Sequence, residues 1–468
     1  MRRRELLAAA GLVLSGAARA DGHAAETQTF EVTVLGSGLA GLTAAAAALE
    51  AGARRVLILE KGPIIGGHSL YSSGSLAAVS PKRQQPQGIR DSVDSLVADS
   101  ERVGGRIDAP LVRTLGERSE AALDWLEGCG VRFAPSVFQS MGGMRPRCVA
   151  APGPNAGRTY VLAVNRRVRC LGGRVLLRHR ANGLRRQGDG WLVDAEGPGG
   201  AVTVRSEAVI IATGGFTANI PLLRHYDARI PATVTTTANP RRLFFDGADG
   251  DGILLAEKAG AALRNMSVIQ LLPYWGGRLL DYAGGELYIN SRGRRFVDET
   301  APWSEIAEAI LGMPGQRMWV ITDAKSRKGA GLGIKLTDGT VRKSGSVREM
   351  AEGMGIDPAV LIETLTDYNI AARSGFDAVT GKRVFTQTID SPPYYWGEEK
   401  LYAHMTLGGI HTDAYARVIG RDGAPVPGLY AAGETAGGIF GMDRLGGLSM
   451  MSCLVFGRLA GRCAVHKI

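Results

Sequence analysis

The chain has 468 residues, of which 45% are hydrophobic and 21% charged. This composition is ordinary for a globular protein, and the length predicts two or three domains. The formal net charge is +10, but the basic residues occur as scattered pairs such as Arg166-Arg167 and are not interleaved with aromatic residues. We therefore do not expect nucleic-acid binding, and the positive charge favours an anionic substrate or an acidic partner protein.

Residues 1–20 have the features of an export signal. Three arginines, Arg2 to Arg4, precede an apolar run from Ala8 to Leu14, and Ala18-Arg19-Ala20 forms an A-x-A cleavage site. The arginine pair followed by two leucines is similar to a twin-arginine signal. We expect cleavage of this segment and a periplasmic protein without a stable membrane span. An ordinary signal peptide or a single uncleaved anchor is the alternative, but the apolar run is shorter than a membrane-spanning helix requires, which favours cleavage.

The cysteines and acidic residues predict neither a redox-active thiol pair nor a metal site. The five cysteines allow at most two disulfides, and the sequence contains no CxxC and no CxxCH motif for a covalently attached haem. Asp249 and Asp251 lie in a glycine-rich segment before a predicted helix, from Ile253 to Leu263, where aspartate forms turns and caps helices. The glutamate that would close a calcium loop is missing.

Residues 30–60 have the pattern of a dinucleotide-binding unit. A predicted buried strand, Phe30 to Leu35, leads through the glycine turn GSGLAG into an alanine-rich helix, Leu39 to Ala51, and then into a second strand that ends at Glu60. The glycines allow the backbone to approach a pyrophosphate, and the helix N-terminus favours its negative charge. An acid at the position of Glu60 can accept hydrogen bonds from ribose hydroxyls.

The chain after Glu60 alternates between helices and short strands. A glycine-rich loop, Lys61 to Ser69, is placed to contact the cofactor. The apolar strand Ala208 to Ala212, which ends in Thr213-Gly214-Gly215, is predicted to return to the parallel sheet. The other predicted elements here are helices at Asp91 to Arg102, Pro110 to Glu127 and Tyr160 to Leu171, and a small meander of strands at Arg174 to Arg178, Trp191 to Ala195 and Ala201 to Arg205.

A change in composition after Pro273 indicates an inserted second domain. It contains a predicted strand, Met318 to Thr322, and a predicted helix, Pro358 to Arg373, opened by Asp357-Pro358. The first domain then resumes, with a strand at Gly428 to Ala431 and a helix from about Arg444 to Gly461. The expected boundaries are 28–272 and 399–468 for the first domain and 273–398 for the second.

Taken together, these motifs resemble the fumarate reductase/succinate dehydrogenase flavoprotein family, and most of all its soluble periplasmic fumarate reductases. The resemblance extends from Phe30 to the C-terminus. The matching segments, in chain order, are Gly36-x-Gly38-x-x-Gly41, Glu60, Ala212 to Gly215, Gly250-Asp251-Gly252, Arg295 to Glu299, His404 to Gly409, Gly428 to Glu434 and Arg444 to Gly447.

The resemblance implies an FAD-dependent oxidoreductase acting on CH–CH groups. The implied fold is α/β: a Rossmann-type FAD-binding domain with an inserted α+β capping domain that closes over the flavin. The positions that match FAD contacts of the family are Gly36, Gly38, Leu39, Ala40, Gly41, Glu60, Lys61, Gly67, His68, Ser69, Gly74, Thr213, Gly214, Gly215, Asp251, Gly433, Glu434, Arg444, Gly447, Leu448 and Ser449.

In the family's reaction, flavin N5 passes hydride to one carbon of a C=C bond conjugated to a carboxylate, and an arginine of the capping domain protonates the other. Arg327 matches that arginine. From chemistry alone we assign it to stabilising negative charge, because a guanidinium is normally never deprotonated. Arg444 and His404 match the residues that bind the carboxylate. Glu299 matches a proton-relay glutamate, although the arginine partner in that relay is not evident, since the sequence continues Thr300-Ala301-Pro302-Trp303.

The clearest departure from the family is Leu272, where fumarate reductases have a histidine for the second carboxylate. Leucine donates no hydrogen bond, and burying a carboxylate against it is unfavourable. Tyr274 and Trp275 follow, and aromatic rings there suit an apolar or heteroaromatic group. With Gly408, Leu272 and Tyr274 form the expected substrate pocket. We therefore expect a monocarboxylic 2-enoate, as in urocanate reductases, in preference to fumarate.

Two further expectations concern the cofactor and the electron partner. His68 aligns with the histidine that binds FAD covalently in succinate dehydrogenases, yet we expect non-covalent FAD with covalent attachment as the alternative. Electrons should come from or go to a separate c-type cytochrome or quinone-linked protein.

One alternative function is a dehydrogenase that desaturates an acid or a 3-ketosteroid. Another is a flavin-binding protein that has lost catalysis.

Overall fold

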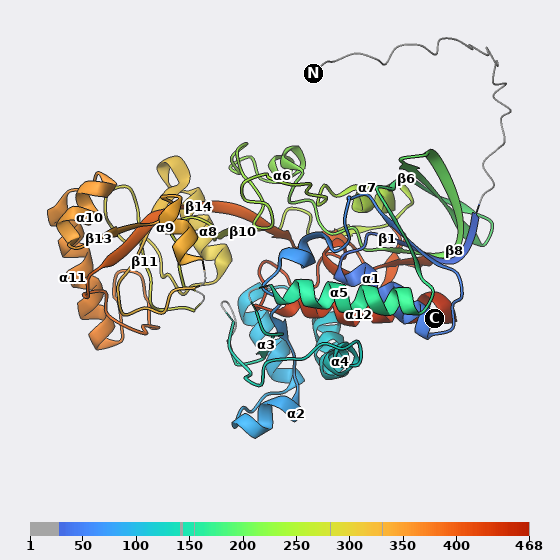
Figure 1. The fold of residues 1–468 in the computed structure, drawn as a ribbon, viewed down its shortest axis with the longest axis horizontal. Helices are drawn as coiled ribbons and strands as arrows, with labels where there is room; N and C mark the ends of the chain where they lie inside the picture. The colour runs from blue at the N-terminus through green and yellow to red at the C-terminus, as the bar shows by residue number, and fades with distance from the viewer. Residues whose placement is uncertain (1–27, 141–143, 154, 281, 330, 468) are drawn as a thin grey trace, which may run out of the picture.

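The computed structural model describes residues 28–140, 144–153, 155–280, 282–329 and 331–467. The expected export signal therefore lies outside the described residues. Two units lie side by side, a larger one built on a mainly parallel sheet and a smaller one connected to it through two strands, β10 and β14 (Figure 1). This mixed α/β architecture confirms the predicted fold class. The domain boundaries remain predictions.

The main sheet has eight strands and contains the predicted dinucleotide-binding unit. Its order is β16-β17-β8-β1-β2-β5, and β7 and β6 extend it from β8. Strands β1, β2, β5, β8 and β17 pair in parallel, which is typical of a sheet covered on both faces. The bounds are β1 Gln28–Leu35, β2 Val56–Glu60, β5 Arg174–Leu177, β6 Arg180–Gln187, β7 Gly190–Gly197, β8 Gly200–Ile211, β16 Arg417–Ile419 and β17 Pro425–Ala431.

The predicted meander was wrong in its details. Two segments that we expected as separate strands form the single strand β8, because no glycine or proline interrupts the chain between Ala201 and Ile211. Strand β5 pairs with β2 in the parallel sheet, and β6, which was not predicted, pairs with β7. Its sequence, RANGLRRQ, has five exposed or half-buried polar residues and thus no apolar alternation to indicate a strand.

Three helices cover one face of the main sheet: α1 (Leu39–Glu50), α5 (Ala156–Cys170) and α12 (Leu448–His466) (Figure 1). Helix α12 begins four residues later than predicted and packs directly on α1, since a Cβ added at Gly461 would lie 2.2 Å from the Ala44 carbonyl oxygen. Among the described helices, α12 alone is long and apolar enough to cross a membrane, but 67% of its most apolar window is buried in the protein. This degree of burial is typical of a helix in the core of a protein.

Further short elements surround this core. The predicted helix at Ile253 is shorter than expected, because Gly260, with φ +97°, ends α7 (Asp251–Lys258).

None of the five cysteines, all of which are described, is in a disulfide. The remaining elements of the larger unit are α2 Pro81–Gln84, α3 Val93–Gly104, α4 Ala109–Gly128, α6 Ile220–Tyr226, β3 Leu76–Ala77, β4 Cys148–Val149, β9 Leu263–Arg264, β15 Gly409–Ile410 and the 3-10 turns η1 Gly67–Tyr71, η2 Gln85–Gln87 and η4 Gly433–Thr435.

The smaller unit is a five-stranded antiparallel sheet with helices, which fits the expected capping domain. The order of its sheet is β10-β14-β12-β11, with β13 also paired to β14. It has its own apolar cores around Tyr368 and Leu279. The elements are β10 Ile269–Pro273, β11 Leu287–Ile289, β12 Arg317–Thr322, β13 Arg342–Ser344, β14 Tyr394–Thr406, α8 Trp303–Leu311, α9 Leu332–Thr337, α10 Val347–Met354, α11 Pro358–Ser374 and η3 Pro314–Gln316.

Candidate functional site

The turn between β1 and α1 is shaped to receive a phosphate group. Gly36, with φ +97°, and Gly41 pack so closely that a Cβ at Gly41 would lie 2.0 Å from the Gly36 carbonyl oxygen. This contact seats Leu39 and Ala40 at the first turn of α1, whose N-cap, Gly38, supplies no side-chain cap. The uncapped N–H groups and the helix dipole favour an anion at this position.

Open space at three backbone positions fits a dinucleotide lying across this turn. A Cβ at Gly214 would meet no atom within 4 Å, and those at Gly38 and Gly67 would meet one only at 3.9 and 4.0 Å. The three glycines come from the β1–α1 turn, the loop after β2 and the end of β8. The residues present thus fit FAD, because a cofactor that runs close to the backbone needs this space.

The acid at the end of β2 holds the glycine turn in place. Glu60 Oε2 accepts hydrogen bonds from the backbone nitrogen and hydroxyl of Ser37, at 2.9 and 2.6 Å, and Oε1 accepts one from Gly62 N at 2.6 Å. These bonds fix the carboxylate beside the turn, where a ribose hydroxyl would donate to its remaining lone pair. The adjacent Lys61 forms ion pairs with Asp249 and Asp251 at the start of α7.

Three other predicted cofactor contacts lie in or near η1. Ser69 Oγ accepts a hydrogen bond from Leu39 N at 3.3 Å, so it meets the first turn of α1. His68 Nε2 lies 2.7 Å from Asp246 Oδ1. Gly74 is packed instead against α5, where a Cβ would lie 2.4 Å from the Gly157 nitrogen.

His68 and Asp246 form an ion pair. Burial alone would lower the pKa of His68, but the hydrogen bond and negative charge of Asp246 raise it above the ordinary value. Burial would likewise raise the pKa of Asp246, yet the bond from His68 brings it down to about 2. Thr236 also donates to Asp246, at 2.6 Å. The ion pair with Asp246 therefore favours the protonated form of His68 next to the cofactor-binding turn.

The C-terminal segments close the other side of this region. A Cβ at Gly215 would lie 2.4 Å from Glu434 Oε1, and Glu434 also accepts a hydrogen bond from Thr406 N at 3.0 Å. Thr213 meets Thr435 at 3.4 Å between their hydroxyls, and Gly433 packs on α1 at Ala40. Gly447, Leu448 and Ser449 form the N-terminus of α12, which also has no side-chain cap.

His404 and Arg444 are in direct contact, although they are 40 residues apart in the chain. Arg444 donates to His404 Nε2 at 2.9 Å, and His404 Nδ1 lies 2.8 Å from the hydroxyl of Thr237. Burial and the positive charge of Arg444 lower the pKa of His404 to about 3, so the ring is neutral. Its guanidinium contacts Met405 Sδ, the Leu445 carbonyl oxygen and His404 Nε2, and within the described residues it forms no ion pair, so its positive charge can bind an anion.

A β-bulge explains how His404 reaches this position. Gln270 of β10 pairs with Met405 and Leu271 pairs with Ala403, which leaves His404 as the extra residue of β14. Bulges commonly redirect a side chain next to an active site. Gly408 follows in the same segment, and a Cβ there would lie 2.2 Å from the Asn265 carbonyl oxygen.

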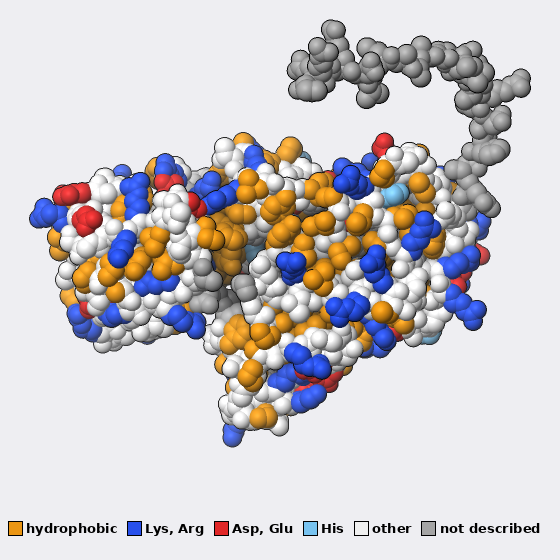
Figure 2. All heavy atoms as spheres, viewed as in Figure 1, with side chains coloured by type: hydrophobic (Ala, Val, Ile, Leu, Met, Phe, Trp, Pro, Cys, Tyr) orange, Lys and Arg blue, Asp and Glu red, His pale blue; other side chains and the backbone are white. Residues whose placement is uncertain are grey.

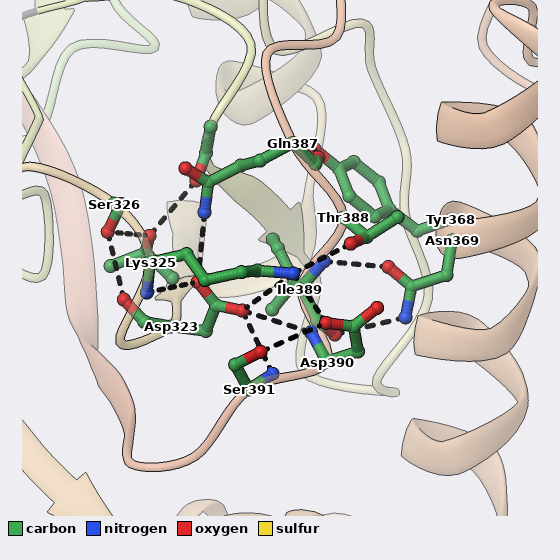
Figure 3. Close-up of polar contacts among 12 residues, drawn as sticks. Asp323, Lys325, Ser326, Tyr368, Asn369, Gln387, Thr388, Ile389, Asp390 and Ser391 are labelled. Atoms are coloured by element: carbon green, nitrogen blue, oxygen red, sulfur yellow. Dashed lines mark hydrogen bonds and ion pairs between the residues drawn. The ribbon is translucent and has the colours of Figure 1, made fainter.

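Arg327 lies in the capping unit, on a turn that is fixed by a buried carboxylate. Asp323, at 0% exposure, accepts hydrogen bonds from the side chain of Gln387 at 2.9 Å and from the backbone nitrogens of Asp390 and Ser391 at 3.0 Å each (Figure 3). Arg327 itself is exposed and lies over the ring of Tyr282, with 5.8 Å between Cζ and the centroid. The structure thus places Arg327 in the capping unit and the His404–Arg444 pair where β14 and the C-terminal segment meet.

Glu299 is the centre of a buried ion cluster in the capping unit. Both of its oxygens receive hydrogen bonds from Arg295, at 2.9 Å each, and Oε2 also receives one from Lys382 at 2.8 Å. Burial would raise the pKa of Glu299, but Lys382 and Arg295 lower it. Glu299 is thus paired with Arg295, four residues earlier in the chain, and its role in a proton relay stays a prediction.

Leu272 and the aromatic residues after it line the start of the capping unit. Leu272, at 5% exposure, is paired with Tyr402 in the β10–β14 ladder. Tyr274 and Trp275 are both 42% exposed and pack edge to face, with 5.7 Å between their ring centroids. Apolar side chains gather on the surface where the two units meet (Figure 2).

Sequence reasoning missed three residues that support this site: Asp246, Thr237 and Arg295. Asp246 and Thr237 contact His68 and His404, which are distant from them in the chain, so the spacing of residues in the sequence does not reveal these contacts. Arg295 pairs with Glu299 in a segment that is not helical, so the helical rule for residues four apart did not indicate this contact either.

Comparisons with known proteins agree with this geometry. The FAD binding domain family matches residues 31–450. The chain is 31% identical over 464 residues to the probable fumarate reductase Ifc3 of Shewanella frigidimarina, covering 95% of this chain and 76% of the relative. It is 32% identical to the urocanate reductase of Eggerthella lenta, covering 93% and 74% of the two chains.

A solved structure is similar over nearly the same range. It is the open conformation of a flavocytochrome c3 fumarate reductase, with a TM-score of 0.77 and 29% identity over 94% of this chain and 78% of that one. The family match, the relatives at about one-third identity and the glycine-lined cradle all identify the cofactor as FAD. The chain therefore belongs to the fumarate reductase flavoprotein family and is an FAD-dependent oxidoreductase acting on CH–CH groups.

Proposed function

We propose that this enzyme reduces the C=C bond of an α,β-unsaturated acid that has one carboxylate and an apolar, aromatic or heteroaromatic far end. The observation that carries the proposal is the contact between neutral His404 and cationic Arg444, with Leu272 in the β10–β14 ladder and Tyr274 and Trp275 directly after β10. A single cation at this position, Arg444, suits a substrate that has a single carboxylate. The relatives named fumarate and urocanate reductases support an unsaturated acid as the substrate class.

In this proposal Arg444 binds the carboxylate with His404 beside it. Three of the five N–H groups of a guanidinium are used, on His404, Met405 and the Leu445 carbonyl, which leaves two for the acid. Two parallel charge-assisted bonds fix the plane of a carboxylate and hence of the conjugated double bond. Bound FAD, once reduced, supplies the hydride for one alkene carbon.

Arg327 completes the reaction when the capping unit closes over the acid. Its guanidinium stabilises the negative charge that develops as the hydride arrives, and the resemblance assigns it the proton for the second carbon. The turn fixed by Asp323 presents Arg327 in a defined position. A relay through Glu299 would use Arg295 as its arginine partner.

We further propose that FAD is bound non-covalently. A protonated imidazole has no free lone pair for a bond to the flavin, and the contact with Asp246 favours that form of His68. Denaturing the purified protein should release all of its FAD, and a protein band that stays fluorescent after denaturation would show a covalent bond instead.

The proposal includes export and a separate electron partner. The sequence of residues 1–20 supports export by the twin-arginine route, and Lys and Arg are spread widely over the visible surface, which suits an acidic redox protein such as a c-type cytochrome or a quinone-linked carrier (Figure 2). Replacing Arg3 and Arg4 together by lysine should retain the protein in the cytoplasmic fraction. Unchanged periplasmic recovery would exclude the twin-arginine route.

The residue that distinguishes a monocarboxylic from a dicarboxylic substrate is Leu272. We expect Leu272→His to supply a donor for a second carboxylate and to raise the ratio of kcat/KM for fumarate over cinnamate by about tenfold, the effect of roughly one hydrogen bond to a charged group. Steady-state assays with a reduced viologen dye as electron donor measure this ratio. Leu271→His, at the next position of β10 but in the apolar core, is the matched control. An unchanged ratio in Leu272→His would reject the assignment.

A further inference from the structure

Thr237 uses all three of its polar groups to connect the acid-binding pair with the aromatic residues. Its backbone nitrogen donates to the Ala403 carbonyl oxygen at 2.9 Å, and its hydroxyl lies 2.8 Å from His404 Nδ1. Its own carbonyl oxygen accepts a hydrogen bond from the indole nitrogen of Trp275 at 2.6 Å. Thr237 therefore contacts both His404 and Trp275 through hydrogen bonds.

The bond to Thr237 determines which nitrogen of His404 carries the proton. A guanidinium only donates hydrogen bonds, so His404 Nε2, which Arg444 contacts, must accept. Because the ring is neutral, its single proton is on Nδ1. Nδ1 therefore donates to the hydroxyl oxygen of Thr237.

This arrangement also orients Arg444. With its proton on Nδ1, His404 offers a lone pair at Nε2 that holds one N–H group of Arg444 and leaves two others free. Without the hydroxyl of Thr237, the Nδ1 proton would be enclosed without an acceptor, which is unfavourable. The ring would then lose its preference for this tautomer, and Arg444 would lose its fixed partner.

The carbonyl oxygen of Thr237 contacts the start of the capping unit, through Trp275. It fixes the indole of Trp275, whose ring packs on Tyr274 and stays 42% exposed. Thr237 thus lies between the group that binds a carboxylate and the aromatic surface at the start of the capping unit.

We propose that Thr237 is the positioning residue that sets the distance between the two ends of the substrate: its hydroxyl orients His404 and Arg444 for the carboxylate, and its carbonyl anchors Trp275 for the apolar end. The role of the two ends rests on the proposed function. The tautomer of His404 does not, since it follows from the contacts of this chain alone.

The test compares Thr237→Val, which keeps the shape but removes the hydroxyl, with Thr237→Ser, which restores it. Thr235→Val is a matched control on the same segment, because the buried hydroxyl of Thr235 has no hydrogen-bond partner. Binding of 3-phenylpropanoate to the oxidised holoenzyme is followed by the change in flavin absorbance. Long-range proton–nitrogen NMR of histidine-labelled protein gives the tautomer of His404, with His404→Asn identifying its signals.

We expect wild-type His404 to show the Nδ1–H tautomer, and Thr237→Val to show a mixture and to bind 3-phenylpropanoate about tenfold more weakly. Thr237→Ser and Thr235→Val should stay within about twofold of wild type. Trp275→Phe should weaken 3-phenylpropanoate but leave propanoate unchanged. Equal binding and equal spectra in Thr237→Val and wild type would overturn the proposal, as would an Nε2–H tautomer in wild type. If wild type binds neither acid, the proposed function fails, while the NMR spectra still decide the role of Thr237.

Discussion

The pKa values of two histidines, His68 and His404, are shifted in opposite directions, and two neighbouring threonines hydrogen-bond to this pair of sites. Thr236 donates to Asp246, the partner of His68, while the next residue, Thr237, accepts from His404. The charge of Asp246 raises the pKa of His68, whereas burial and Arg444 lower that of His404 to about 3. Environments that separate the pKa values of like groups mark functional sites.

The pH dependence of stability should report the ion pair of His68. Because folding raises the pKa of His68, the stabilisation by its charge is fully present below the unfolded value near 6.5 and is lost as pH rises through the higher folded value. The free energy of unfolding lost in His68→Asn should therefore be largest near pH 6 and shrink at higher pH. Urea denaturation of the holoenzyme at several pH values measures it, with exposed His225→Asn as control. A loss that grows with pH would contradict the ion pair.

At this scale the sequence predicted the residues better than their contacts. The resemblance identified His404 and Arg444 as a pair, and the structure places them together. It could not identify Asp246 or Thr237, because a threonine or aspartate in a polar loop has no distinctive spacing and gains its role only from the fold. Arg327 lies in the capping unit, on the turn that Asp323 fixes, and its role in the reaction stays a prediction.

The close packing of α1 against the cofactor-binding turn is the main feature at the scale of elements. The glycine turn and β1, α1 and β2 were all predicted from the sequence, because strand, turn and helix each have a strong local signal. β6 and the full length of β8 were not, because their pairing depends on the antiparallel hairpin that β7 forms with each. The bulge at His404 likewise has no local signal.

Gly41→Ala should disrupt this packing. Its Cβ would lie 2.0 Å from the Gly36 carbonyl oxygen, so α1 must move away from the turn, at a cost of about 1–3 kcal/mol in stability and with loss of bound FAD. Gly128→Ala, at the end of α4 where nothing lies within 4 Å, should be neutral or stabilising by up to about 1 kcal/mol. Thermal unfolding and the ratio of FAD to protein measure both effects. Full FAD content in Gly41→Ala would show that the turn tolerates a side chain.

The ion cluster of Glu299 should stabilise the capping unit. Lys382 is 0% exposed and pairs with Glu299, so Lys382→Met leaves less compensation for a buried carboxylate. We expect a loss of about 3–5 kcal/mol in stability, the usual effect of breaking a buried pair. Lys343→Met on the exposed side of β13 should change stability by less than about 0.5 kcal/mol. Urea denaturation compares them, and equal stabilities would show that the cluster is dispensable.

In the whole molecule, β10 and β14 connect the chemistry of the two units. Both strands lie in the capping sheet, yet their ends meet at Gln270 and Met405, beside His404 and Arg444. A movement of the capping unit about these strands would therefore carry Arg327 relative to a site that stays fixed on the larger unit. The sequence indicated the inserted unit through its composition but not the role of these two strands, because strand pairing across an insertion is a property of the complete fold.

The most direct test of the account is the reaction of the reduced flavin with unsaturated acids. The purified holoenzyme is reduced with dithionite under anaerobic conditions and mixed with fumarate, acrylate, urocanate or cinnamate, while flavin absorbance is recorded. We predict that a monocarboxylic enoate reoxidises the flavin faster than fumarate does, and that Arg327→Ala abolishes this phase. Fastest reoxidation by fumarate, or a flavin that stays reduced with every acid, would contradict the account.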